Sequence, residues 1–324
     1  MLKKFVAPAV VALGLAVAAS GAAEAQTRVT LKSAKAGSSY YVMMVQLGEL
    51  MKKESGGKIQ PTVEESQGSV QNVKEAGRRP GNFLFTTPPN LLADARTGKK
   101  PFEGETGYDK IRTLFVMPFV TVHLVVQKDS GVTDVMQLAG KKFIAGGKGT
   151  FCERRTARIF ELLGLDGKVD VIDVELDAAS NAMRNDKVAG FATCSSHPTP
   201  QLVELATTTP LVVLSFTDAQ RKAILAADPL SGPLSIAPGT YKDQSQAVET
   251  VGVPVGAFTT TAMDDETAYF ITRNFWQKRD QLAKENPWWA GVSPEMVNQL
   301  GTQLHPGALK YYKEAGIKVD DSLM

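Results

Sequence analysis

The chain has 324 residues, of which 43% are hydrophobic, and a formal net charge of +2 at pH 7. The 36 basic and 34 acidic residues nearly cancel and form no long basic run, which argues against nucleic acid or an anionic membrane surface as the partner. The two cysteines and three histidines show no ligand spacing, so we expect neither a metal site nor a cofactor.

The N-terminus has the pattern of a secretory signal peptide. Lys3 and Lys4 precede an apolar run over residues 5–19, and Ala23-Glu24-Ala25 forms a small-x-small cleavage site. The run is shorter than the roughly 20 apolar residues that a membrane span needs, and no later stretch approaches that length. We therefore expect residues 1–25 to be removed and the protein, which does not span the membrane, to reside in the periplasm.

The next part of the chain alternates short strands with helices, which predicts an α/β fold with largely parallel sheets. Strands are expected at residues 29–31, 61–64 and 83–85. Helices are expected over residues 41–53, from residue 69 and over residues 90–96. Two adjoining apolar runs, 114–120 and 122–126, predict two buried strands.

A second α/β unit follows. Strands are predicted at 142–145, 169–174, 189–193 and 211–214, with one helix that ends at Gly164 and another over residues 178–184. A strand at 253–260 and a long helix at 264–285 are interpreted as the return to the first unit. Because about 250 to 300 residues is the upper size for one core, we expect two lobes. Lobe 1 would comprise residues 26–121 plus 260–324, and lobe 2 residues 122–259, with the hinge near Val122 and Gly256.

Three Gly/Ser/Thr loops, at residues 36–41, 66–72 and 146–150, each follow a strand and open a helix. The first turn of a helix carries unpaired N–H donors and a partial positive charge, so each of these strand–helix junctions is a potential binding site for a carboxylate. The alternative is that these residues serve only turns and helix caps. In an open α/β sheet, ligands gather at the carboxyl ends of strands. The candidate ligand-binding residues there are Ser38, Ser39, Tyr40, Gly68, Ser69, Asn72, Thr86, Thr87, Lys148, Gly149, Thr150, Ser195, Ser196 and His197.

Several of these residues have competing roles. Ser69 and Asn72 either contact the ligand or cap their own helix. The Thr150 hydroxyl is expected to cap its helix, which would leave the amides of Gly149 and Thr150 for a carboxylate. Lys148 lies beside the same helix N-terminus and either pairs with a bound acid or is solvated.

Two aromatic candidates also have alternatives. Of Tyr40 and Tyr41, one ring is expected to form a wall of the cleft with its hydroxyl reaching the ligand, while the other packs inward; Tyr40 is the candidate for the cleft. His197 either senses pH or contacts the ligand, and the alternative is an ordinary hydrogen-bonding or surface residue.

The two cysteines, Cys152 and Cys194, each follow a predicted strand of lobe 2. Disulfides persist in the periplasm, so the alternatives are one disulfide between them or two separate thiols.

Three sequence segments resemble those of a known family: residues 198–209, which begin Pro-Thr-Pro, residues 236–241 and residues 304–312. With the three loops, they resemble the TAXI family, the extracytoplasmic solute receptors associated with TRAP transporters. The resemblance implies a two-lobed periplasmic-binding-protein fold of type II with two crossing hinge strands. It also implies a small carboxylate or amino acid as the ligand, often glutamate or a related dicarboxylic acid, and delivery to TRAP membrane subunits, whose transport an ion gradient drives. We expect such a receptor to be a monomer.

Other functions remain open. The same fold could serve an ATP-driven importer or a periplasmic sensor, and nothing readable in the sequence marks a partner-facing surface. A hydrolase would need a nucleophile and a base, for which Ser195 and His197 are the candidates. No G-x-S-x-G elbow surrounds Ser195, so we do not expect an enzyme.

Overall fold

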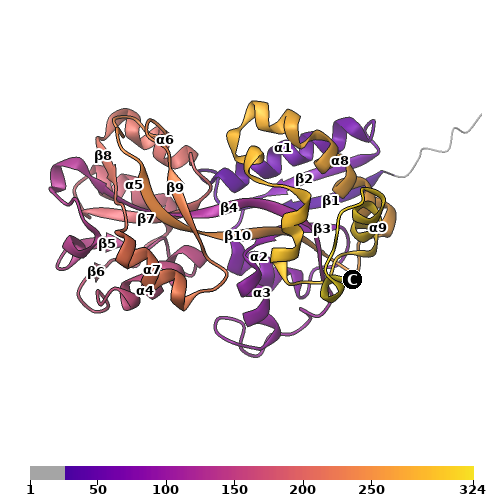
Figure 1. Cartoon of the computed structure of the whole chain (residues 1–324), viewed down its shortest axis with the longest axis horizontal. Helices are drawn as coiled ribbons and strands as arrows, with labels where there is room; N and C mark the ends of the chain where they lie inside the picture. The colour runs from indigo at the N-terminus through magenta and orange to yellow at the C-terminus, as the bar shows by residue number, and fades with distance from the viewer. Residues whose placement is uncertain (1–25) are drawn as a thin grey trace, which may run out of the picture.

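The computed structural model describes residues 26–324, and the predicted signal peptide, residues 1–25, lies outside the described residues. Figure 1 shows two lobes side by side along the long axis of the molecule, joined by strands β4 and β10. A single path of paired strands, β2-β1-β3-β10-β4-β7-β5-β6, runs through both lobes, with β8 on β4 and β9 on β10. Within residues 26–324, no helix is both long and apolar enough to cross a membrane.

Lobe 1 begins with three strand–helix units. Parallel pairing joins β1 (Thr27–Lys32) to β2 (Ile59–Glu64) and to β3 (Phe83–Thr87). Each strand leads into a helix: α1 (Ser39–Glu54), α2 (Ser69–Ala76) and α3 (Pro89–Arg96). These elements lie where the sequence predicts them. Most extend beyond the predicted ends, because the flanking polar residues also take part in strand pairing or in helical turns.

Strand β4 (Ile111–Gln127) is one 17-residue strand, so the prediction of two separate strands was wrong. Its first half pairs with β10 (Val248–Thr260) and its second half with β7 (Gly190–Ser195), both antiparallel. Pro118 does not break it, because the β10 register shifts between Val253 and Val255 beside it. Strands β4 and β10 are therefore the two connections that pass between the lobes.

Lobe 2 contains a short parallel sheet and four helices. Strand β5 (Lys142–Ile144) pairs with β6 (Asp170–Val171) and with β7. Helices α4 (Phe151–Leu162) and α5 (Leu176–Arg184) were expected. The sequence analysis did not identify three further elements, α6 (Pro200–Thr208), α7 (Asp218–Ala227) and β9 (Gly232–Ile236), nor did it predict the extension of β10 back to Val248. Strand β8 (Leu211–Val213) pairs with the end of β4.

The C-terminal part returns to lobe 1 (Figure 1). Helix α8 (Asp265–Glu285) starts at an Asp264 cap, and its Phe275 ring stacks on Phe115 of β4 at 4.1 Å between centroids. Helix α9 (Pro306–Glu314) packs on α8. Short 3-10 helices complete the chain at Lys128–Ser130, Val135–Leu138, Pro287–Gly291, Pro294–Leu300 and Asp321–Leu323.

The buried apolar side chains form separate cores for the two lobes. The largest core takes residues from 29–120 and 253–323, whereas two smaller ones take residues from 122–251. Phe151 of α4 is the exception, because it is buried in the core of lobe 1. This division between cores places the junction of the lobes, and any cleft between them, at the middle of β4 and β10.

Candidate functional site

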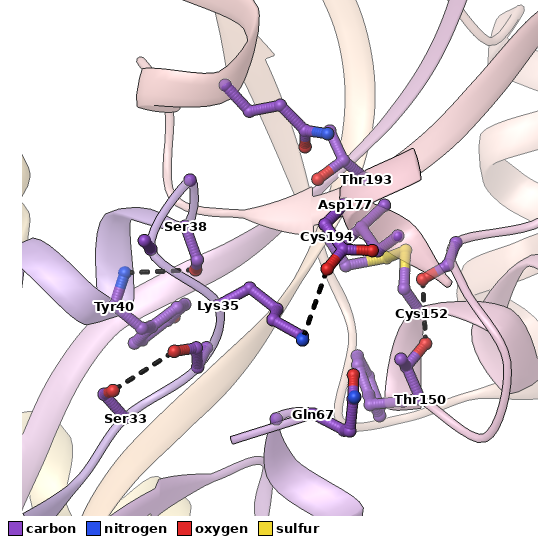
Figure 2. A pocket seen from close by; sticks show the side chains of 18 of the residues that line it. Ser33, Lys35, Ser38, Tyr40, Gln67, Thr150, Cys152, Asp177, Thr193 and Cys194 are labelled. Carbon is purple, nitrogen blue, oxygen red and sulfur yellow. Dashed lines mark hydrogen bonds and ion pairs between the residues drawn. A yellow bond between two sulfur atoms is a disulfide. The ribbon is translucent and has the colours of Figure 1, made fainter. Parts of the chain in front are cut away.

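A cavity of about 470 Å³ lies between the lobes, at the ends of the strands that lead into α1, α2 and α4 (Figure 2). Lobe 1 contributes the β1–α1 and β2–α2 loops and Thr86, while lobe 2 contributes the loop before α4, one face of α5 along its whole length and part of α6. Six of the predicted binding residues line it, namely Ser38, Tyr40, Gly68, Ser69, Thr86 and Thr150. Of the other candidates, none is among its lining residues.

The start of helix α2 opens into this cavity without a cap. Its N-cap position is Gly68, with φ of 97°, and no side chain accepts a hydrogen bond from the first turn. Ser69 therefore does not cap the helix. The hydroxyls of Ser69 and Thr86 line the cavity and have no hydrogen-bond partner among residues 26–324. These donors and the helix N-terminus together could bind an anionic group.

Asn72 lies behind that wall. It is buried, and its Nδ2 donates to the carbonyls of Ser33 at 2.8 Å and Thr86 at 3.3 Å. It therefore holds the β1 and β3 ends together and does not cap α2. Thr87, the next residue on β3, is also buried and donates its hydroxyl to the Pro88 carbonyl.

Charged groups of both signs line the cavity. Lys35 of lobe 1 lies 3.4 Å from Asp177 of lobe 2, measured from Nζ to Oδ2, so this pair bridges the two walls (Figure 2). Glu65 accepts a hydrogen bond from the Ala36 amide at 2.8 Å. Arg184 and Glu204 complete the charged lining. Such a surface can bind a ligand that carries both a carboxylate and an ammonium group.

Tyr40 forms a wall of the cavity, but its hydroxyl donates to the Pro118 carbonyl of β4. Burial raises the pKa of this phenol well above its ordinary value. The expectation that the hydroxyl reaches a ligand was therefore wrong, since β4 already occupies it. Ser38 caps α1 by accepting from the Tyr40 amide at 3.2 Å.

The loop before α4 differs from its expected role. The Thr150 hydroxyl donates to the carbonyls of Gly146 and Gly147, each at 2.9 Å, and accepts from the Glu153 amide, which confirms that it serves its own helix. The amides of Gly149 and Thr150 are not left for a ligand, because Gly149 donates to Glu153 Oε2 at 2.7 Å and Thr150 to the Gly147 carbonyl. The expectation that these amides bind a ligand was therefore wrong, because the Glu153 carboxylate already accepts the hydrogen bond from the Gly149 amide.

Lys148 projects from this loop into solvent. Its Nζ lies 2.9 Å from Asp173 Oδ2, and this hydrogen bond raises the pKa of the lysine. Neither Lys148 nor Gly149 is among the residues that line the cavity.

Ser195, Ser196 and His197 follow one another at the junction of the lobes. Ser195 Oγ accepts from the Ser39 amide of α1 at 3.0 Å, and Ser196 Oγ donates to the Phe119 carbonyl of β4 at 2.8 Å. His197 Nδ1 lies 2.7 Å from Thr121 Oγ1. These side chains tie lobe 2 to lobe 1 beside the cavity.

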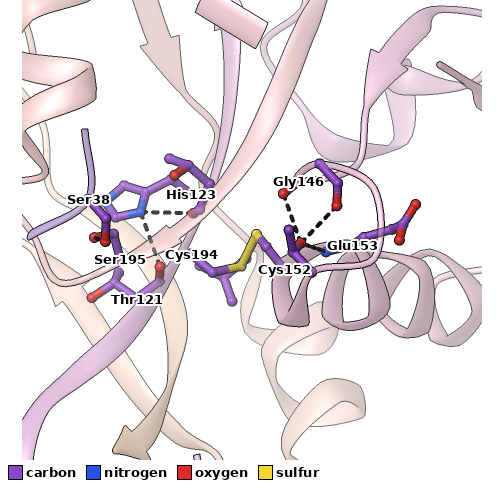
Figure 3. The surroundings of a disulfide bond; sticks show 12 residues. Ser38, Thr121, His123, Gly146, Cys152, Glu153, Cys194 and Ser195 are labelled. Atoms are coloured by element: carbon purple, nitrogen blue, oxygen red, sulfur yellow. Dashed lines mark hydrogen bonds between the residues drawn. A yellow bond between two sulfur atoms is a disulfide. The ribbon is translucent and has the colours of Figure 1, made fainter. Parts of the chain in front are cut away.

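A second buried histidine, His123 on β4, was not singled out by the sequence analysis. Its Nδ1 faces the carbonyls of Thr121 (Figure 3) and Thr193. Tyr241 donates its hydroxyl to Nε2 at 2.9 Å. Burial, with a smaller effect of His197, lowers the pKa of His123 to about 3. The ring is therefore neutral at physiological pH and carries its proton on Nδ1.

Cys152 and Cys194 form a disulfide, with 5.3 Å between their Cα atoms (Figure 3). Both cysteines also line the cavity. Of the two alternatives that the sequence left open, the structure contains the disulfide.

The sequence analysis missed the charged lining residues. Lys35 and Glu65 each lie one residue before a loop that the sequence analysis named, and their charges were the signal that could have identified them. Asp177 and Arg184 belong to α5, which only the fold brings to the cavity. Within residues 26–324, no group of three or more His, Cys, Asp or Glu side chains is placed to hold a metal ion.

Comparison with known proteins identifies both the family and the fold. The model of the NMT1-like family matches residues 31–316. The periplasmic binding protein BugD is similar in structure, with a TM-score of 0.57 and 13% identity over 91% of this chain and 99% of that one. MatC from Rhodopseudomonas palustris, solved with bound malate, has a TM-score of 0.56 and 13% identity over 90% of this chain and 96% of its own. The fold is that of the two-lobed periplasmic binding proteins, as expected.

Proposed function

The chain belongs to the NMT1-like family, and from that premise we propose that it is a periplasmic receptor that captures a small organic acid or amino acid between its lobes. Its solved structural neighbours include periplasmic solute-binding proteins, which supports a receptor role. The ligand class is our inference from the cavity.

The uncapped start of α2 is the observation that carries this proposal. Free N–H groups at a helix N-terminus favour a negative group, and the unpartnered hydroxyls of Ser69 and Thr86 add two donors beside it. Lys35 supplies a positive charge on the same wall. A ligand carboxylate seated there would gain charge-assisted hydrogen bonds.

The charges around the whole cavity favour an amino acid over a plain dicarboxylate. Asp177 and Glu204 of lobe 2, together with Glu65 of lobe 1, present three carboxylates against the two cations Lys35 and Arg184. Because the carboxylates outnumber the cations, a ligand ammonium group would find a partner more readily than a second ligand carboxylate would. L-glutamate, which carries both groups, is the first candidate.

A thermal-shift screen of the mature protein, freed of co-purified ligand by unfolding and refolding, tests this proposal. The panel is L-glutamate, 2-oxoglutarate, succinate and malate, the last because MatC was solved with it. A ligand that binds only the folded state must raise the melting temperature. We expect a concentration-dependent rise with at least one acid, a smaller rise in Ser69→Ala and an unchanged rise in the exposed control Thr207→Ala. No rise with any acid would refute an acid ligand.

The hinge of this receptor is proposed to lie in β4 and β10, near Val122 and Gly256, because these strands are the connections between the two cores. Closure about such strands would bring the α5 wall onto the α2 wall. Small-angle scattering should show a smaller radius of gyration when the binding acid saturates the protein. An unchanged radius would argue against hinge closure.

For the partner, we propose a TRAP-type membrane transporter, on the resemblance of the sequence to the TAXI receptors. An ATP-driven importer and a periplasmic sensor are the alternatives. Uptake of the bound acid into membrane vesicles from the source cells, with this protein added, would decide: dependence on an ion gradient supports the TRAP assignment, and dependence on ATP contradicts it.

A further inference from the structure

The Cys152–Cys194 disulfide lies in the wall of the cavity and joins the first turn of α4 to the end of β7. We propose that this disulfide is a positioning element of the ligand site: it holds the loop of residues 146–150 in the shape that completes the lobe 2 wall. Opening it would weaken ligand binding while lobe 2 stays folded. This inference rests on the proposed receptor function.

The loop packs directly on the disulfide. Gly146 has φ of 118°, and a Cβ placed on it would lie 2.6 Å from Cys152 Cβ and 2.7 Å from its Sγ. On the other side, a Cβ on Gly147 would lie 2.7 Å from Leu176 Cβ at the start of α5. The loop is therefore wedged between the disulfide and α5, and Gly146, Cys152 and Leu176 all line the cavity.

The other end of the disulfide is fixed to the junction of the lobes. Cys194 pairs with Val122 of β4 in the sheet and packs against the cores of both lobes. The next residue, Ser195, accepts the hydrogen bond from the Ser39 amide of lobe 1. Phe151, beside Cys152, is buried in the core of lobe 1. The disulfide thus connects the cavity loop to the place where the two lobes meet.

The loop's other bonds are local to lobe 2. Thr150 bonds to Gly146 and Gly147 within the loop, and the Lys148 amide donates to the Val174 carbonyl before α5. Strand β5 ends at Ile144, just before the loop, and pairs with β7, and both α4 and α5 pack on β7, so the body of lobe 2 keeps its fold without the disulfide. The disulfide adds the covalent link between the first turn of α4 and β7. Two thiols cannot approach as closely as two bonded sulfurs, so we expect loss of the bond to let the first turn of α4 and residues 146–150 shift away from Cys194.

Three forms of the mature protein test this role: the oxidised protein, Cys152→Ser/Cys194→Ser, and protein reduced with a water-soluble phosphine. In the reduction, the phosphine gives two electrons to the disulfide and takes oxygen from water as phosphine oxide, while two protons complete the thiols. Ile224→Ala, a core truncation on α7 outside the cavity lining, controls for loss of stability. The readouts are calorimetric titration with L-glutamate and amide hydrogen exchange of residues 146–154.

We expect both disulfide-free forms to bind L-glutamate at least tenfold more weakly and to exchange faster at residues 146–154, with circular dichroism unchanged. Ile224→Ala should alter neither affinity nor exchange there. Oxidised-like affinity and exchange in the disulfide-free forms would overturn the proposal, as would global unfolding of the reduced protein at 10 °C. If the oxidised protein binds no L-glutamate, titration uses whichever acid gave the largest thermal shift. If none binds, the receptor proposal fails, while hydrogen exchange still decides whether the disulfide positions the loop.

Discussion

Ser195 Oγ lies 2.6 Å from Ser39 Oγ and accepts a hydrogen bond from the Ser39 amide at 3.0 Å, so one hydroxyl at the end of β7 joins lobe 2 to the first turn of α1 in lobe 1. Both residues are buried. The Ser38 hydroxyl lies 3.1 Å from the same oxygen. Ser195 therefore serves the lobe junction, and among residues 26–324 its side chain forms no hydrogen bond with the His197 ring.

Ser195→Ala should destabilise the protein by about 1–3 kcal/mol, because the buried Ser39 amide and two hydroxyls lose their partner. Urea unfolding measures the change. The control Thr207→Ala removes an exposed hydroxyl that bonds only within its own turn, and should stay within about 0.5 kcal/mol of the wild type. Any turnover of simple esters that Ser195→Ala abolishes would instead support the hydrolase alternative.

Lys35→Gln should weaken acid binding by about tenfold or more, since one charge-assisted contact is worth roughly 1.5–3 kcal/mol. Its effect on unfolding should stay below about 1 kcal/mol, because Lys35 and Asp177 are 29% and 61% exposed and such pairs contribute little. Titration calorimetry and urea unfolding separate the two effects. Unchanged affinity would remove Lys35 from the site.

Asp177→Asn separates the two ligand classes. If Asp177 binds an ammonium group, this variant should weaken L-glutamate binding by about tenfold or more. Succinate and 2-oxoglutarate have no ammonium, and their binding should stay equal or improve because Lys35 loses its competing partner. Thermal shifts with all three acids make the comparison. Equal losses for all of them would contradict an ammonium subsite.

Acid should destabilise the fold through His123. Its pKa is about 3 in the folded protein and about 6.5 in the unfolded chain, so between these values the unfolded state binds the extra proton. Stability therefore falls as pH drops from 6.5 towards 3, with about 2 kcal/mol lost by pH 5. Burial lowers the pKa of His197 and His305 too, and they act in the same direction.

Urea unfolding of the wild type and His123→Gln at pH 6.5, 5.8 and 5.0 checks this contribution. The variant should lose less stability over that interval, although it starts less stable because the bond to Tyr241 changes. Parallel losses in both proteins would show that His123 does not titrate as inferred.

Gly146→Ala should lower both stability and acid affinity. The φ of 118° is unfavourable for alanine, and the new Cβ would collide with the Cys152 backbone and side chain. Gly131→Ala is the matched control: its φ of 68° is strained too, at about 1–2 kcal/mol, but nothing lies within 4 Å of the added carbon. The Gly146 variant should therefore lose more stability than the control, and only it should lose affinity for the acid. Equal losses would mean that the loop relaxes away from the disulfide.

The sequence by itself determined the α/β class and most strands and helices. Strand and helix periodicity is a local property, and the capping residues Ser38 and Thr150 act within a few positions of themselves. It also located three of the loops that form the cavity, because glycine and serine mark the turns between strands and helices. It could not show that residues 114–126 belong to one strand, since that depends on the partners β10 and β7.

Only the tertiary structure decided which polar groups remain available to a ligand. Gly149 and Lys148 looked suited to an anion from their place in the chain, but Glu153 and Asp173 occupy them. The Tyr40 hydroxyl is likewise taken by Pro118, 78 residues away. Lys35 and Asp177, 142 residues apart, meet across the cavity only after both lobes form. A hydrogen-bonding group can bind a ligand only if the fold leaves it unpaired, and pairing between distant residues cannot be read from local sequence.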